Sequence, residues 1–142
     1  MRISSLSLSL VATLLCASAH AQTHDVKMLN RGADGAMVYE PDYLHIAPGD
    51  TVRFIATHSS HNAASLPGLW PAGVPAFMGQ INQQVEQTFT TPGLYGIQCL
   101  PHLAMGMVML IQVGPASGHT PAWPAELPPR AIERLKAIAQ KR

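Results

Sequence analysis

Residues 99–107 read CLPHLAMGM and contain the features that decide how the whole chain is interpreted. A cysteine is followed three positions later by a histidine, and two methionines flank a glycine. Thiolate, imidazole and thioether groups are soft or borderline ligands that suit copper. Two histidines, one cysteine and a weak axial methionine make up a blue-copper centre. The stretch therefore predicts most of a copper site, which a second histidine would complete.

The first 21 residues, MRISSLSLSLVATLLCASAHA, have the features of a secretory signal peptide. A positive charge at Arg2 precedes an apolar run, and Ala19 and Ala21 form an A-x-A cleavage motif. The apolar run is shorter than the ~20 residues that cross a bilayer, which disfavours the alternative of a membrane anchor. We expect cleavage after Ala21, export to the periplasm and no membrane span in the mature chain.

Cleavage leaves Cys99 without another cysteine, because Cys16 lies in the leader. Exported proteins usually pair their thiols. An unpaired cysteine indicates an intermolecular bridge, a reactive thiol or a metal ligand, and a buried inert cysteine is the structural alternative. The neighbours of Cys99 favour the metal ligand.

The mature chain is long enough for one domain with a modest core. The chain has 9 basic and 8 acidic residues, and one of the basic residues, Arg2, leaves with the leader. A formal charge of zero gives no support to a nucleic-acid partner. The charge is unevenly distributed, since residues 22–114 are mildly acidic and residues 115–142 are mildly basic.

Residues 22–114 predict an all-β sandwich or barrel. Short β-branched or aromatic segments alternate with turn sequences such as APGD at 47–50 and TPG at 91–93. In one segment Val52 and Phe54 face one way while their neighbours face the other. The predicted strands are DVKML (25–29), YLHIA (43–47), TVRFIA (51–56), VEQTFT (85–90), LYGIQ (94–98) and MVMLIQV (107–113).

Two further segments have a different composition. The stretch SLPGLWPAGVPAF at 65–77 predicts a long loop or a broken helical turn. Residues 115–142 begin with a proline-rich linker and end in RAIERLKAIAQKR, where Pro129 suits a first helical position. We expect this helix to pack an apolar face on the β-domain; that face comprises Ile132, Leu135, Ile138 and Ala139.

The second histidine of a copper site has to come from outside residues 99–107. The sequence HSSHN at 58–62 directly follows a predicted strand, so its loop can meet the Cys99 loop at one end of a sandwich. His61, followed by Asn62, is the preferred candidate. The other candidates are His24, His45, His58 and His119.

The chain resembles the cupredoxins, and within them the pseudoazurins, from about residue 26 to residue 136. The motifs GADGAMVYEP, IAPGDTVRFI, SHN, TFTTPGLYGIQC and CLPHLAMGMV occur in the order of that family. The resemblance implies a Greek-key β-sandwich or barrel with a C-terminal α-helical extension. We therefore expect a signal peptide at 1–21, a cupredoxin domain at 22–114 and a linker with a helix at 115–142.

The resemblance also implies one type 1 copper ion per chain. It assigns His61, Cys99 and His102 to the trigonal plane and Met107 to the axial position. Met105, three residues after His102, is the alternative with the shorter spacing of amicyanins. By the same resemblance, the backbone near Asn62 is expected to donate a hydrogen bond to the cysteine sulfur.

The function implied is electron transfer by Cu(II)/Cu(I) cycling, in a monomer, with a partner such as a copper nitrite reductase or a c-type cytochrome. An enzyme is not expected, because the chain has neither an H-x-H nor an H-C-H motif for a second metal centre. The alternative is a copper storage or delivery module.

Many pseudoazurins surround their copper face with lysines, whereas Lys27 is the only lysine here before residue 136. We therefore expect apolar docking around His102; the residues expected to frame it are Met37, Pro101, Leu103 and Ala104.

Overall fold

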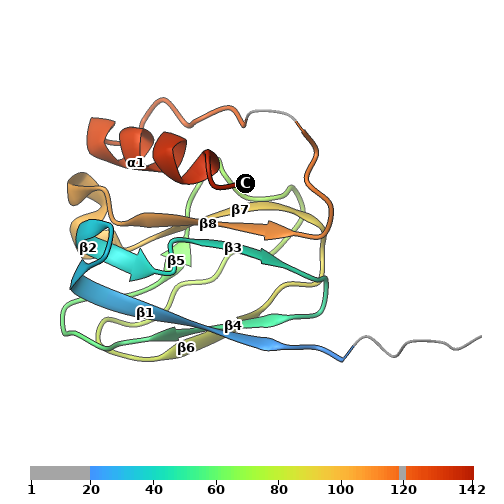
Figure 1. The fold of residues 1–142 in the computed structure, drawn as a ribbon, viewed down its shortest axis with the longest axis horizontal. Coiled ribbons are helices and arrows are strands. Elements are labelled where there is room, and N and C mark those ends of the chain that lie inside the picture. The colour runs from blue at the N-terminus through green and yellow to red at the C-terminus, as the bar shows by residue number, and fades with distance from the viewer. Residues whose placement is uncertain (1–19, 119–120) are drawn as a thin grey trace, which may run out of the picture.

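The computed structural model describes residues 20–118 and 121–142. All but the last two residues of the predicted leader, and the candidate ligand His119, lie outside this range. Two sheets lie face to face, and a helix covers the outer side of one of them (Figure 1). The prediction of an all-β sandwich with a C-terminal helix is confirmed.

Each sheet has four strands. The first has the order β2 (Gly35–Glu40), β1 (Thr23–Gly32), β4 (Thr51–Ile55) and β6 (Val85–Thr88). The second has the order β3 (Tyr43–Ile46), β8 (Val108–Val113), β7 (Gly93–Gln98) and β5 (Ala64–Ser65). The pairs β1–β4 and β3–β8 are parallel, and the remaining pairs are antiparallel. The chain therefore crosses repeatedly from one sheet to the other.

The main core lies between the sheets and is built from alternate residues of their strands. In β4, Val52 and Phe54 are fully buried while the residues between them are partly exposed, as the alternating pattern predicts. Strand β8 differs, because all of its residues are buried. A strand buried on both faces needs a second layer outside the sheet.

Helix α1 (Pro129–Ala139) supplies that layer (Figure 1). Its residues Leu135 and Ile138 pack with Val108 and Leu110 of β8 in a second buried cluster. The predicted apolar face needs one correction, since Ala131 is buried in this cluster whereas Ile132 is only partly buried. The small Ala131 side chain lets the first turn of the helix approach the β-domain closely. No helix in the described ranges is both long and apolar enough to span a membrane.

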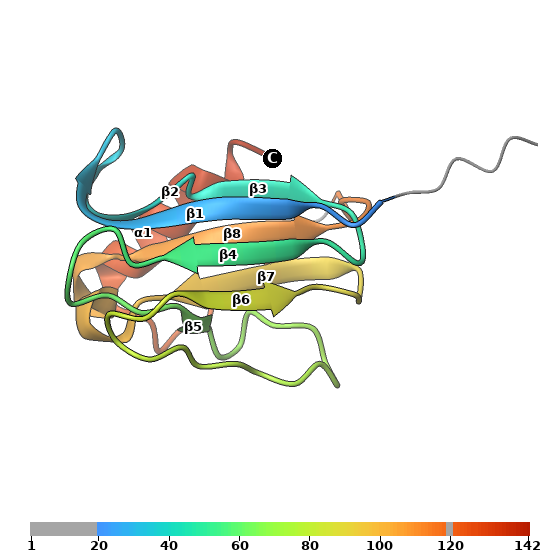
Figure 2. The same ribbon diagram turned by 90° about the horizontal axis from the view of Figure 1, so that it is seen from below.

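The strands run between two ends of the sandwich, and these ends differ. At one end β1 begins, while at the other the short 3-10 helix η1 (Leu100–Met105) joins β7 to β8 (Figures 1 and 2). The stretch CLPHLAMGM thus forms a loop at the end of the sandwich.

Candidate metal centre

The predicted ligands come from three places along the chain. His61 lies between β4 and β5, Cys99 directly follows β7, and His102 lies in η1. Met107 immediately precedes β8, which is the antiparallel neighbour of β7. The N–H of Cys99 donates to the Met107 carbonyl (3.0 Å), and the N–H of Met107 donates to the His102 carbonyl (3.1 Å). The sheet itself therefore closes the loop that carries three of the four candidates.

Three ligand atoms converge at this end. The Cys99 sulfur lies 3.7 Å from Nδ1 of His61 and 3.5 Å from Nδ1 of His102. The two Nδ1 atoms are 3.1 Å apart. Among the residues that the structure describes, these three form the one cluster of histidine, cysteine and acidic side chains with the spacing of a metal site.

The two candidate methionines occupy different surroundings. Met107 is 0% exposed and belongs to the same buried cluster as Cys99. Met105 is 42% exposed at the end of η1 and lines a surface cleft with residues of α1. Burial beside the cysteine favours Met107 as the axial candidate.

The orientation of His61 is fixed by a hydrogen bond that the sequence did not suggest. Its Nε2 donates to Oδ1 of Asn30, 2.8 Å away on β1. Because Nε2 carries the proton, Nδ1 presents its lone pair toward Cys99 and His102. Burial lowers the pKa of His61, and the neighbouring His102 and His58 lower it further. The imidazole is therefore held neutral, which is the form that binds a metal.

The surroundings of the Cys99 sulfur raise the pKa of its thiol overall. Burial raises the pKa of the thiol, while the backbone N–H groups of Asn62 and His102 donate to the sulfur and lower it. The Asn62 contact agrees with the expectation from the resemblance. Asn62 is held firmly, because Oδ1 accepts from the N–H of Leu100 (2.9 Å) and Nδ2 donates to the Gly79 carbonyl (3.0 Å). This side chain thus ties the His61 loop to the Cys99 loop.

Helix α1 contacts the ligand loop directly. Gly106 has φ 83°, and a Cβ atom there would lie 2.9 Å from the carbonyl oxygen of Arg130. A residue with a side chain would be strained by the positive φ and would press against the helix backbone. The Gly106 N–H donates to the Leu103 carbonyl (2.9 Å) and closes η1. Gly106 therefore lets the loop between His102 and Met107 turn beneath the helix.

The surface near the site is apolar. Of the residues predicted to frame His102, Pro101 and Ala104 are exposed, while Leu103 packs toward α1 and Met37 toward the main core. The sequence analysis did not identify the most exposed apolar residues of this surface. The exposed large apolar residues in the described chain are Met78 (71%), Ile81 (51%), Leu100 (43%) and Met105 (42%). Met78, Ile81 and Leu100 line one hollow with Asn62.

The other candidate histidines that the structure describes have different partners. His58 accepts a hydrogen bond at Nδ1 from the N–H of Asn30 (2.9 Å). His24 contacts Asp50 (2.8 Å), and His45 contacts the carbonyl of Gly114 (2.7 Å). None of these three belongs to the cluster around Cys99.

A two-sheet sandwich with two imidazoles and one thiolate gathered at one end is the arrangement of the blue copper proteins. Comparison with known sequences agrees with this class. Residues 26–114 match the model of the family described as copper binding proteins, plastocyanin/azurin family. This segment spans β1 to β8 and includes all four candidate ligands.

Similar proteins and solved structures identify the subgroup of blue copper proteins that this chain resembles. A pseudoazurin of Paracoccus pantotrophus is 45% identical over 87% of this chain and 86% of its own. A putative pseudoazurin of Rhizobium leguminosarum is 49% identical over 89% of this chain and 78% of its own. The crystal structure of native pseudoazurin from Hyphomicrobium denitrificans superposes with a TM-score of 0.74 at 34% identity, covering 84% of this chain and 98% of that one. The chain therefore belongs to the copper-binding plastocyanin/azurin family, among its pseudoazurins. It is a copper protein of the electron-transfer class rather than an enzyme.

Proposed function

We propose that the protein is a periplasmic electron carrier that binds one type 1 copper ion through His61, Cys99, His102 and Met107. The observation that carries the proposal is the convergence of the two Nδ1 atoms and the cysteine sulfur. When bound, the copper supplies the one-electron step between Cu(II) and Cu(I). The surrounding hydrogen bonds and the burial of the ligands would hold such an ion in place and shield it from water.

The distances between the three ligand atoms fit the binding of one metal ion by all three. Ligand atoms about 2.0–2.3 Å from one first-row metal ion lie about 3–4 Å apart. The observed separations of 3.1, 3.5 and 3.7 Å fall within this range. The hydrogen bonds of Asn30 and Asn62 hold the ligand-bearing loops in place. A frame that changes little between oxidation states supports rapid exchange of single electrons.

His102 supplies the route to the partner. It is partly exposed, whereas His61, Cys99 and Met107 are fully buried. The apolar residues Leu100, Ile81 and Met78 lie on the surface beside the site and can exclude water when a partner docks. The family resemblance favours a copper nitrite reductase or a c-type cytochrome as that partner, with the carrier acting as a monomer.

Burial of three ligands argues against the alternative of copper storage or delivery, which requires ligands that an acceptor can reach. Cyclic voltammetry of the copper-loaded protein separates the two functions. The carrier is expected to give a reversible one-electron wave and to retain its copper in the presence of a weak chelator. An irreversible wave, with rapid loss of copper to the chelator, would contradict the proposal.

Export and domain organisation belong to the same proposal. We infer a leader at 1–21, a copper domain at 22–114 and a tail at 115–142 whose helix stabilises the ligand loop. Mass spectrometry of the protein from the periplasmic fraction tests the cleavage, with Gln22 expected as the first residue. Retention of the leader on a cytoplasmic protein would contradict it.

A further inference from the structure

The start of β1 lies at the end of the sandwich opposite the Cys99 loop (Figures 1 and 2). Gln22 directly precedes this strand, whose first two residues are Thr23 and His24, so a chain that begins at Gln22 has a histidine as its third residue. Such a terminus offers four nitrogens that can surround one ion: the α-amine, two backbone amides and an imidazole. Four nitrogens in a plane are the set that Cu(II) and Ni(II) prefer.

The structure brings the backbone nitrogen of Gln22 and the imidazole ring of His24 to one carboxylate, that of Asp50. The backbone nitrogen of Gln22 donates to Oδ1 of Asp50 at 2.9 Å. Nε2 of His24 lies 2.8 Å from Oδ2 of the same side chain. Asp50 is 5% exposed, and its Oδ2 also accepts from the N–H of Ala47 (3.1 Å). The hydrogen bond from Gln22, followed by that from His24, holds the pKa of Asp50 below its ordinary value.

We propose that the processed amino terminus Gln22-Thr23-His24 is a second Cu(II) site, independent of the Cys99 site. The inference rests on the proposed cleavage after Ala21, which creates the free α-amine. Binding would use the α-amine nitrogen of Gln22, the amide nitrogens of Thr23 and His24, and Nδ1 of His24. The ammonium and the two amides each release one proton as the copper–nitrogen bonds form, and the copper stays Cu(II).

The observed contacts suit this mode of binding. Asp50 engages Nε2 of His24, whereas the chelate needs Nδ1. A carboxylate on the far nitrogen of a metal-bound imidazole orients the ring and makes it a better ligand. The α-amine keeps two N–H groups when its lone pair binds copper, so it can still donate to Asp50.

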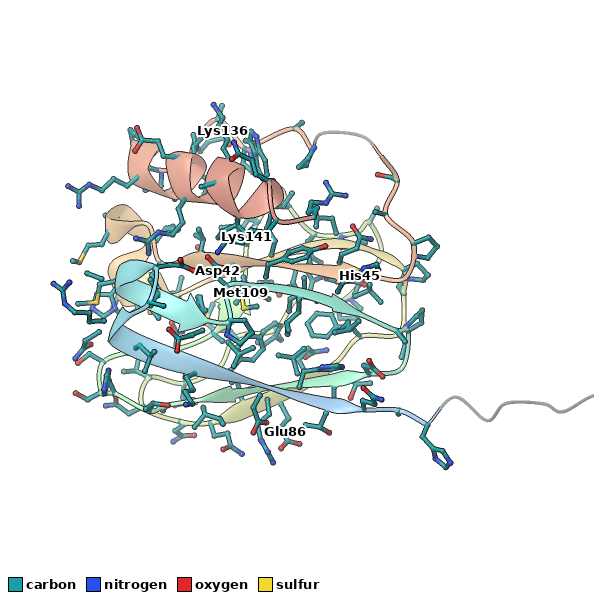
Figure 3. The ribbon with its side chains drawn as sticks, in the orientation of Figure 1. Asp42, His45, Glu86, Met109, Lys136 and Lys141 are labelled. Carbon is teal, nitrogen blue, oxygen red and sulfur yellow. The ribbon has the colours of Figure 1, made fainter. Side chains whose placement is uncertain are left out.

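The local fold makes the segment accessible. A hollow of about 540 Å³ opens beside it and is lined by His20, Gln22, His24, His45 and Asp50, among others. His45 lies toward the same end of the molecule (Figure 3). The proposed cleavage after Ala21 would remove His20, one of the residues that line this hollow. Thr23 and His24 pair with Thr51 and Val52 as the first residues of β1, so copper binding would open only the end of the strand.

The test uses exported protein whose first residue has been confirmed by mass spectrometry and whose blue site is already filled with copper. One further equivalent of Cu(II) is added in the presence of excess glycine, followed by gel filtration. We expect the second copper to be retained. Its EPR spectrum should have the wide parallel hyperfine splitting of a tetragonal nitrogen site, beside the narrow splitting of the blue centre. A second copper that is lost on the column would overturn the proposal.

Two variants locate the ion. His24→Gln should lose the second copper, whereas the control His45→Gln, in the same hollow, should retain it. Both should keep the blue absorption, which separates this proposal from that of the Cys99 site. Equal retention by His24→Gln and the unmodified chain would overturn the proposal, as would loss only in His45→Gln.

A chemical control requires no mutation. Glutaminyl cyclase makes the α-amine of Gln22 attack its own side-chain amide carbon, so that a nitrogen–carbon bond forms and ammonia leaves. The product is lighter by one ammonia and has no terminal amine. It should bind no second copper, and full binding by this form would show that the α-amine is not a ligand.

Discussion

Asn30 and His61, separated by 31 positions in the sequence, are joined by a hydrogen bond of 2.8 Å between Oδ1 and Nε2. The bond runs from β1 to the loop after β4, and it decides which nitrogen of His61 faces Cys99. The β1–β4 pairing brings the two residues together, since Lys27 of β1 lies opposite Ile55, the last residue of β4. The geometry of the site thus depends on the first sheet as well as on the ligand loop.

Replacing Asn30 tests this dependence. Asn30→Ala removes the acceptor and leaves the proton on His61 free to move to Nδ1, where it blocks the metal. We expect copper affinity to fall by about 10–100-fold, the usual effect of losing the hydrogen-bond partner of a ligand. Competition against a chelator of known affinity measures the copper affinity of each variant. Asn30→Asp keeps an acceptor and should restore most of the affinity; equal affinities of the Ala variant and the unmodified protein would contradict the role of Asn30.

The axial position is tested by a pair of methionine variants. Met107→Gln replaces a thioether with an oxygen ligand, which favours Cu(II) and should lower the reduction potential. Met105→Gln changes a side chain that is 42% exposed and should leave the potential nearly unchanged. Cyclic voltammetry compares the two. A large shift for Met105→Gln with none for Met107→Gln would assign the axial position to Met105.

Asp50 gives a pH-dependent contribution to stability. Its pKa is lowered in the folded protein, so the carboxylate stabilises the fold fully above the ordinary value of 3.8 and loses this effect as pH falls through the lowered pKa. Asp50→Asn should cost about 1–3 kcal/mol of unfolding free energy at pH 7, because it weakens charge-assisted hydrogen bonds. Denaturant unfolding at pH 7 and pH 3 measures the difference, which should shrink at the lower pH. A difference that is constant with pH would mean that the charge is irrelevant.

Charge steering of the partner should be weak. The exposed residues Met78, Ile81 and Leu100 are apolar, and Lys141 is neutralised by Asp42 (2.8 Å; Figure 3) and Asp34 (2.9 Å). Salt shortens the screening length from ~30 Å at 0.01 M to ~10 Å at 0.1 M, so a steered encounter slows steeply over this range. We expect the electron-transfer rate to change by less than about threefold.

Stopped-flow kinetics at pH 8 measures how the electron-transfer rate depends on salt. Two variants then test whether the apolar surface is the docking surface. Ile81→Lys should slow the reaction by disturbing the apolar surface. Glu86→Lys on β6, a residue that does not line the hollow formed by that surface, should not slow it. Figure 3 shows Glu86 at the edge of the molecule formed by the first sheet. A steep fall in rate with salt in the unmodified protein would show that charge does steer the encounter.

Strands with a clear local sequence pattern could be predicted from the sequence. The alternation around Val52 and Phe54 correctly predicts β4, and the turn sequences separate most of the other strands. The patterning did not predict β2 and β5 as strands. Strand β2 begins at a glycine and contains Met37 at φ 51°, and β5 is only two residues long, so neither has a periodic signal. Pairing with β1 and β7 makes them strands.

The candidate ligands were identified by their chemistry and by family resemblance, but their supporting contacts were not. Asn30 is an ordinary polar residue of a strand, and only the folded structure shows it beside His61. Likewise, the contact of Gly106 with the Arg130 carbonyl depends on where α1 docks. Local sequence patterns do not contain such long-range contacts.

The central claim is that Cys99, with His61 and His102, binds copper as a blue centre. The most direct measurement is the visible absorption spectrum of the copper-loaded protein and of Cys99→Ser prepared in the same way. We predict an intense band near ~600 nm and a second near ~450 nm, both from charge transfer at the cysteine sulfur, and the loss of both in Cys99→Ser. A colourless oxidised protein, or a Cys99→Ser protein with undiminished colour, would contradict the claim.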